Sequence, residues 1–296
     1  MDRLDHLALF VAVAERGGFG AAARKAGRSA AAVTRAVAAL EEEFGARLFN
    51  RTTRAVHLTD EGDKLFARAK NLLADYDDMA ESLRGAVEPR GLLTITAPVM
   101  FGRLHIMPLV KDFLRAHRQA QIDLRLHDNV LSLIDEGVDL GVRIGELPDS
   151  SLIALRVGAV RRQLVAAPAY LAARGAPKTP ADLANHDLIS TFNLSAQPGL
   201  WPLGPREEHL LRIRPHLTVN SVDAALDAAI SGLGIARLFS YQVEAAVARG
   251  ALRPILRDQE PPPAPIHLLR PAGRRSPAKV SAFIDAAATV LRAKFA

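Results

Sequence analysis

An alanine-rich stretch between Ala21 and Gly45 is interrupted near its middle by Gly27 and Ser29. Alanine is the strongest helix former, whereas a glycine inside a helix costs about 1 kcal/mol. Serine is favoured just before a helix, where its hydroxyl accepts a hydrogen bond from a free backbone N–H. The stretch therefore predicts two helices joined by a tight turn, and not one long helix.

Three helices are predicted before residue 45. The first has apolar residues at spacings of three and four and ends at Gly17 and Gly18. The second spans residues 19–26, and the third begins after Ser29. Their predicted buried residues are Leu4, Leu7, Val11 and Ala14 in the first, Phe19, Ala22, Ala23 and Ala26 in the second, and Val33, Val37, Leu40 and Phe44 in the third.

The second and third helices fit a helix-turn-helix that reads DNA. Ala30, Ala31 and Ala38 are small enough to let the helix backbone approach a groove, and Thr34 and Arg35 can donate hydrogen bonds to phosphates or base edges. These residues taken alone are equally compatible with a helical hairpin in an ordinary protein core.

A basic segment at residues 46–59 favours the DNA-binding interpretation. Its pattern predicts a β-hairpin wing with Arg51 to Arg54 at the tip, next to the third helix, although many basic loops are simply solvated. The candidate DNA-binding residues are Ser29, Ala31, Thr34, Arg35, Arg51, Thr52 and Arg54.

A long helix is predicted after Thr59, which can cap it, and the acidic Asp60 and Glu61 suit the positive end of the helix dipole. Its apolar residues are spaced alternately four and three apart, as in a coiled coil, and charged residues fill the other positions. The pattern favours self-association over packing on the helix's own domain, and residues 85–91 predict a hinge. The candidate dimerisation residues are Leu65, Ala69, Leu72, Tyr76, Met79 and Leu83.

From residue 91 onwards, short apolar strands alternate with helices, which predicts an α/β fold with a largely parallel sheet. The predicted strands are 92–98, 122–128, 138–145, 187–192, 233–239 and 265–271, with an extended crossing segment at 152–168. The predicted helices are 101–117, 130–137, 222–232 and 276–295.

Composition narrows the function classes. The 296 residues carry a net charge of +6, which weakly favours an anionic partner, and contain no cysteine. The N-terminal residues lack a signal-peptide pattern, and no apolar run is long enough for a membrane helix, so we expect a cytoplasmic protein without a membrane partner. We expect no metal and no cofactor, because the histidines lack metal-ligand spacing: His186, His209, His216 and His267.

Four segments carry a family pattern: the N-terminal AAARKAGRSAAAVTRAVAALEEEFGARLFNRTTRAVHLTDEGDKLFARA, and further along TAPVMFGRLHIMPLV, EGVDLGVRIG and GLGIA. In these segments the chain resembles the LysR-type transcriptional regulators, and the resemblance extends along essentially its whole length. The resemblance implies a winged helix-turn-helix at 1–58, a dimerising linker helix and hinge at 59–90, and an effector-binding domain at 91–296. That domain would comprise two Rossmann-like α/β subdomains, as in periplasmic solute-binding proteins, at about 91–162 with 266–296 and at about 163–265. The implied partners are double-stranded promoter DNA, a small-molecule effector, and further copies of the chain in a homodimer or homotetramer.

The sequence departs from the family pattern in two places. Arg28, Ala30 and Ala31 flank the cap of the third helix where the family commonly has apolar, then polar or proline residues, which shifts base reading towards Thr34, Arg35, the wing and DNA shape.

Met100 stands where the family often has a hydroxyl that holds a carboxylate, which implies a partly apolar effector. Core packing of Met100 and Phe101 is the alternative. The candidate effector-binding residues are Thr96, Pro98, Met100, Phe101, Asn129, Ile144, Asn220 and Val222.

Two other function classes fit less well. An enzyme is disfavoured because the chain has no G-x-S-x-G elbow, no phosphate-binding glycine loop, no HExxH pair and no cysteine nucleophile. A solute-binding protein of a transport system would suit the C-terminal two-thirds, but not the basic N-terminal module. Measuring the DNA affinity of that module separates the regulator from the solute-binding protein.

Overall fold

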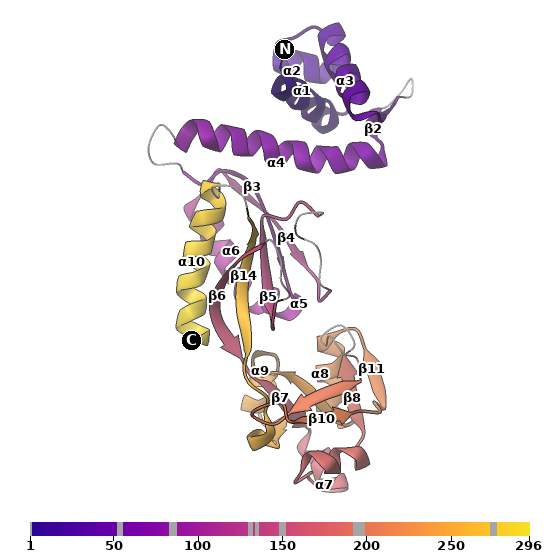
Figure 1. The fold of residues 1–296 in the computed structure, drawn as a ribbon, viewed down its shortest axis with the longest axis vertical. Helices are drawn as coiled ribbons and strands as arrows, with labels where there is room; N and C mark the ends of the chain where they lie inside the picture. The colour runs from indigo at the N-terminus through magenta and orange to yellow at the C-terminus, as the bar shows by residue number, and fades with distance from the viewer. Residues whose placement is uncertain are drawn as a thin grey trace. The chain divides into compact units, whose positions relative to one another are not determined.

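The computed structural model describes residues 2–51, 56–82, 88–129, 133, 136–147, 152–191, 199–272 and 277–296 (Figure 1). The chain divides into two compact units. The first comprises residues 1–92 together with short segments at 119–121 and 276–279, and the second comprises the remainder.

The first unit begins with three helices whose ends are specified by neighbouring residues. They are α1 (Arg3–Arg16), α2 (Phe19–Ala26) and α3 (Ala30–Phe44). Asp2 and Asp5 form a reciprocal cap at the start of α1, in which the Asp5 N–H donates to the Asp2 carboxylate at 2.8 Å. Gly17 and Gly27 end α1 and α2 with φ of 66° and 60°, a left-handed conformation that glycine adopts without strain. The three predicted helices are confirmed.

The core of this unit lies between α1, α2 and α3. It includes Phe10, Val33 and Leu40, which are at most 1% exposed. Two positions expected inside are wrong: Ala26 is exposed, and Phe44 is 51% exposed. The buried stripe of α3 therefore ends at Leu40, one turn before the helix does, because apolar spacing continues beyond the residues that α3 buries.

A hairpin and a long helix complete the first unit. Strands β1 (Phe49–Arg51) and β2 (Val56–Leu58) pair antiparallel, with Phe49 opposite Leu58. Helix α4 (Asp60–Ser82) follows directly. The predicted hairpin and linker helix are confirmed.

The second unit contains two five-stranded sheets. The first has the order β4-β3-β5-β14-β6. Strand β3 runs parallel to β5, whereas β14 runs antiparallel to both β5 and β6. The strand bounds are β3 Gly91–Ala97, β4 Ala120–Leu126, β5 Leu140–Ile144, β6 Leu152–Val160 and β14 Ala264–Pro271.

The second sheet has the order β11-β8-β12-β7-β13. Strand β8 runs parallel to β11 and β12, and β7 runs antiparallel to β12 and β13. The hairpin β9–β10 forms a separate two-stranded sheet. The strand bounds are β7 Arg162–Ala166, β8 Leu188–Thr191, β9 Leu200–Leu203, β10 His209–Arg212, β11 Leu217–Val219, β12 Ile235–Phe239 and β13 Arg253–Ile255.

Both sheets are mixed, so the expectation of a largely parallel sheet is wrong. The reason is topological: the chain leaves the first sheet through β6 and enters the second through β7, then returns through β13 and β14, and each of these crossing strands runs antiparallel to a neighbour. The strands through which the chain passes between the two sheets are not joined to their neighbours by a βαβ unit, so they need not run parallel to them.

Helices accompany both sheets (Figure 1). In the first, α6 and α10 lie together, with the rings of Phe113 and Phe283 5.3 Å apart edge to face. The predicted helix at 101–117 begins earlier, at Val99, and contains a π-helical turn at 102–106. The predicted helix at 130–137 lies largely outside the described residues. The bounds are α5 Val99–Phe101, η1 Gly102–Ile106, α6 Met107–Ala116, α7 Pro168–Arg174, η2 Pro180–Asn185, α8 Val222–Ile230, α9 Ser240–Ala248, η4 Arg257–Gln259 and α10 Ala278–Phe295.

Candidate DNA interface and effector pocket

The helix pair α2–α3 forms a helix-turn-helix with an exposed outer face. Ser29 caps α3 by accepting a hydrogen bond from the Ala32 N–H at 3.2 Å. Ala31 and Arg35 are exposed on α3. The Thr34 hydroxyl donates to the Ala30 carbonyl at 2.9 Å, so only its acceptor side is free unless the hydroxyl rotates. The predicted readers thus lie on the face opposite the buried stripe.

Glu41 connects the wing to α3. Its carboxylate accepts hydrogen bonds from the backbone N–H groups of Leu48 at 2.9 Å and Phe49 at 3.4 Å, at the start of the hairpin. The Phe49 ring packs 5.3 Å from Phe10 and 5.7 Å from Phe19. Sequence reasoning missed Glu41, because nothing in the run of three glutamates distinguishes the one that turns inward.

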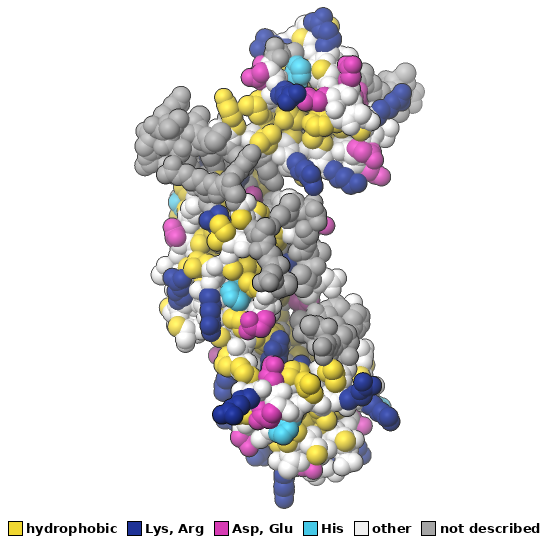
Figure 2. All heavy atoms as spheres, viewed as in Figure 1, with side chains coloured by type: hydrophobic (Ala, Val, Ile, Leu, Met, Phe, Trp, Pro, Cys, Tyr) yellow, Lys and Arg dark blue, Asp and Glu magenta, His cyan; other side chains and the backbone are white. Residues whose placement is uncertain are grey.

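The predicted wing contacts are only partly visible. Arg51 ends β1 opposite Val56, but its side chain lies outside the described residues, as do Thr52 and Arg54. On the face drawn in Figure 2, basic and acidic side chains are interspersed over the first unit. Charge on that face therefore does not distinguish a DNA-binding surface, and the DNA-binding role of the exposed face of α3 stays a prediction.

Thr59 and Gly62 position the start of the linker helix α4 next to the hairpin. The Thr59 hydroxyl donates to the Arg47 carbonyl at 2.6 Å and accepts from the Gly62 N–H at 3.0 Å, which caps α4 as predicted. A Cβ at Gly62 would overlap the Leu48 carbonyl oxygen. Glycine is therefore required where α4 crosses the backbone that enters the hairpin.

The predicted dimerisation residues lie in different environments. Ala69 is buried in the core of the first unit, and Leu65 and Leu72 pack against that core. Tyr76 is 50% exposed. The side chain of Met79 and all of Leu83 lie outside the described residues. Their role in self-association stays a prediction.

The predicted effector residues are mostly buried where they come from the first sheet. Thr96 is fully buried, with its Oγ1 2.6 Å from His127 Nε2. Met100 is 3% exposed, and Phe101 is fully buried within 5.3 Å of the Tyr241 ring. Pro98 precedes α5 and is half-buried. These side chains present little surface to a ligand in this state.

The remaining predicted effector residues do not share one environment. Asn129 and Asn220 are exposed, Ile144 is half-buried, and Val222 is buried at the start of α8. Their role in effector binding also stays a prediction.

The N-terminus of α5 already has an anionic partner. The Val99 N–H donates to Asp128 Oδ1 at 3.0 Å. Burial raises the pKa of Asp128, and the hydrogen bond from Val99 opposes that shift. A ligand anion at the Val99 N–H would first have to displace Asp128.

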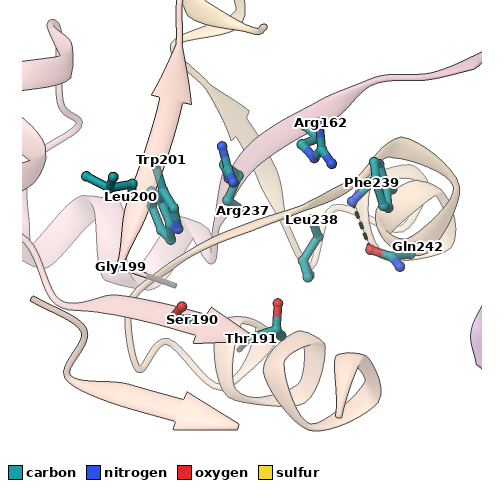
Figure 3. Close-up of a pocket in the computed structure, with 10 residues that line it drawn as sticks. All are labelled: Arg162, Ser190, Thr191, Gly199, Leu200, Trp201, Arg237, Leu238, Phe239 and Gln242. Carbon is teal, nitrogen blue, oxygen red and sulfur yellow. Dashed lines mark hydrogen bonds between the residues drawn. The ribbon is translucent and has the colours of Figure 1, made fainter. Parts of the chain in front are cut away.

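A small pocket lies at the second sheet, lined by residues of β7, β8, β9, β12 and α9 (Figure 3). Arg162 and Arg237 both face it, each beside an aromatic ring. None of the eight predicted effector residues lines this pocket. Sequence reasoning missed it because its residues are separated by up to 80 positions and form no motif.

Two family models together cover most of the chain. The model of the bacterial regulatory helix-turn-helix protein of the lysR family matches residues 4–63, and the model of the LysR substrate-binding domain matches residues 86–292. The chain belongs to the LysR family of transcriptional regulators.

Similar proteins span the whole of this LysR-type regulator. The transcriptional regulator PtxR of Pseudomonas aeruginosa is 35% identical over 284 residues, covering 95% of this chain and 91% of PtxR. Full-length CrgA of Neisseria meningitidis is 30% identical with a TM-score of 0.62, covering 97% of this chain and 98% of that one. The virulence activator AphB of Vibrio cholerae is 28% identical with a TM-score of 0.61 and the same coverage. The named relatives are regulators.

Three further observations concern this LysR-type regulator. Among the described residues, no three His, Asp or Glu side chains gather as a metal site would require. In the part of the chain that the structure describes, no helix is both long and apolar enough to cross a bilayer. Arg28, Ala30 and Ala31, where the sequence departs from the family, are all exposed around the start of α3.

Proposed function

We propose that this regulator binds promoter DNA in the cytoplasm as a homodimer or homotetramer, without a metal or cofactor and without catalysing a reaction. The observation that carries the proposal is the exposed face of α3 beside a wing that Glu41 ties to the same helix. A recognition helix in the major groove and a wing on the backbone together supply base and phosphate contacts.

We further propose that a small-molecule effector binds the α/β domain between its two sheets and changes how the subunits pack. Repacking would alter the spacing of the paired DNA-binding units and hence the DNA that they hold. An ion pair between η1 and α8 supports this. Arg103 and Asp223 lie 3.4 Å apart and are exposed, so a motion of one sheet relative to the other can break the pair.

The deciding experiment measures binding of the purified protein to its own upstream DNA over a salt series, with a random duplex of equal length beside it. Protection of two half-sites, at an affinity well above that for the random duplex, supports the proposal. Equal affinity for both duplexes at every salt concentration contradicts it, because only charge would then be acting.

Three variants distinguish base contacts from phosphate contacts. Arg35→Ala should weaken binding to the specific site and relax base preference, whereas Arg51→Ala and Arg54→Ala should weaken binding to every sequence and reduce the salt slope by about one. Identical behaviour of the three variants would show that the contacts are assigned wrongly.

Self-association is tested at Tyr76 and not at Leu72, because Leu72 packs against the core of its own unit. Tyr76→Asp should shift the sedimentation profile towards monomer and weaken operator binding, since a charge would enter the proposed helix seam. An unchanged sedimentation profile argues against the seam, and Lys64→Ala on the same helix serves as the control.

A further inference from the structure

The pocket at the second sheet brings two arginines onto one face. Residues directly opposite in an antiparallel pair share a face, and Arg162 on β7 lies opposite Phe239, while Arg237 on β12 lies opposite Leu164. The two arginines are therefore diagonal neighbours. Figure 3 shows their side chains between Trp201 on one side and Phe239 on the other.

The guanidinium groups are packed in place by aromatic rings. The Arg162 Cζ lies 4.8 Å from the centre of the Phe239 ring, and the Arg237 Cζ lies 5.5 Å from that of Trp201. Arg237 also donates to the Pro202 carbonyl at 3.0 Å. Both groups are thus pre-organised, so little side-chain entropy would be lost on binding a ligand.

Among the described residues, neither arginine has a carboxylate within ion-pair distance. The neighbouring Arg161 shows the contrast, because it pairs with Glu260 at 3.6 Å. The undescribed segment 192–198 contains no Asp or Glu in its sequence. Within the described part of the chain, the exposed Glu207 attracts both arginines and opposes the effect of burial on their pKa values.

Two half-buried cations side by side are costly without a counter-charge. Burial lowers the pKa of Arg162, and burial together with repulsion from Arg162 lowers the pKa of Arg237 to about 9. An anion bound between them would relieve both effects. The pocket therefore has the electrostatics of an anion site.

The volume of the pocket and its polar lining indicate what kind of anion fits. The cavity measures about 30 Å³, room for about two water molecules or one planar carboxylate. Ser190 and Thr191 line it and can add hydroxyl donors. Gln242 is already engaged, since its Oε1 accepts from the Phe239 N–H at 2.8 Å and its Nε2 donates to the Tyr241 hydroxyl at 3.1 Å.

We propose that Arg162 and Arg237 bind the carboxylate of a small organic acid, and that this pocket is where the acid group of the effector is held. The identification of the acid as the effector rests on the proposed function, whereas the binding of a carboxylate by the two arginines does not. It places the acid group at the second sheet and not at the N-terminus of α5, which Asp128 occupies.

Trp201 gives a direct readout, because it is the single tryptophan of the chain and contacts Arg237. The full-length protein is titrated near pH 7 with sodium acetate, benzoate and succinate while its fluorescence is recorded. Acetamide, benzamide, sodium chloride and inorganic phosphate are titrated in parallel. We expect saturable changes with at least one carboxylate and none with its uncharged amide.

Arg162→Gln and Arg237→Gln should each weaken carboxylate binding at least about tenfold, as the loss of a charge-assisted hydrogen bond implies. Arg161→Gln is the matched control on the adjacent residue and should bind like the parent. Glu207→Gln should tighten binding, because it removes the opposing charge and leaves the pocket intact. Circular dichroism verifies the fold of each variant.

Several results would overturn the proposal: equal affinity in the Arg162 variant and the parent, equal responses to benzoate and benzamide, or tighter binding of phosphate than of any carboxylate. Operator binding is measured on the same samples. Carboxylate binding that depends on Arg162 but leaves operator affinity unchanged contradicts the proposed effector response and supports the carboxylate site.

Discussion

Two helix starts in this protein are capped in opposite ways. Ser29 caps α3 by accepting from Ala32, three residues further along the chain, whereas Asp128 caps α5 at Val99 from 29 residues away. The first unit is built largely from such local signals, and the second from contacts between distant segments. The difference explains why a sequence pattern locates a recognition helix more easily than a ligand pocket.

The same contrast applies to the functional sites. The exposed face of α3 follows from the helix period once its buried stripe is known. The arginine pocket follows from a register, because Arg162 faces Arg237 only when β7 and β12 pair as they do. A slip of β7 by one residue against β12 would put the two side chains on opposite faces of the sheet.

The largest expected effect is a loss of stability that is confined to the first unit. Gly62→Ala should destabilise it by about 3 kcal/mol, since the new Cβ overlaps the Leu48 carbonyl oxygen and the backbone must move. Hydrogen exchange should show faster exchange in α1 to α4 with little change in the two five-stranded sheets.

Gly20→Ala is the matched control, because a Cβ there meets nothing closer than the Arg24 side chain at 3.8 Å. It should leave the unit as stable or make it more so. Equal loss of protection in both units of the Gly62 variant would contradict the separation between local and distant contacts.

The next effect belongs to the second unit and depends on pH. His105 is 9% exposed among Phe101, Tyr241 and Phe295, and burial, with repulsion from Lys294, lowers its pKa from 6.5 to about 4. The unfolded chain therefore takes up the proton first as the pH falls. Stability should be fully present above pH 6.5 and decrease towards pH 4, by roughly 2 kcal/mol at about pH 5.

Urea unfolding of the second unit at several pH values tests this. His105→Leu should flatten part of the dependence and not all of it, because burial also lowers the pKa of His186 and His267. An unchanged slope in the variant would show that His105 does not carry the effect.

The smallest effects compare the two caps directly. Ser29→Ala and Asp128→Ala should each cost about 1 kcal/mol, the first in the DNA-binding unit and the second in the α/β domain. Asp128→Asn should restore most of the loss, because its amide oxygen can still accept from Val99. Native-state hydrogen exchange reports each unit separately, and a loss in the wrong unit would refute the assignment.

Sequence reasoning recovered the helix-turn-helix, the wing and the linker helix, because glycine turns, Ser29 and Thr59 act within a few residues. It overextended the buried stripe of α3 to Phe44, which is half exposed. It left open whether Met100 and Phe101 contact an effector or pack in the core, and both are buried in the structure. Apolar residues next to a cleft and apolar residues beneath it have the same pattern, and only packing separates them.

The sequence by itself determined the family, the three helices of the first unit and the side of α3 that carries Ala31 and Arg35, since periodicity and capping are properties of short segments. The tertiary structure alone decided that the sheets are mixed, that Asp128 fills the start of α5, and that Arg162 and Arg237 meet. Those outcomes depend on strand register and on desolvation, which arise only when distant segments pack together.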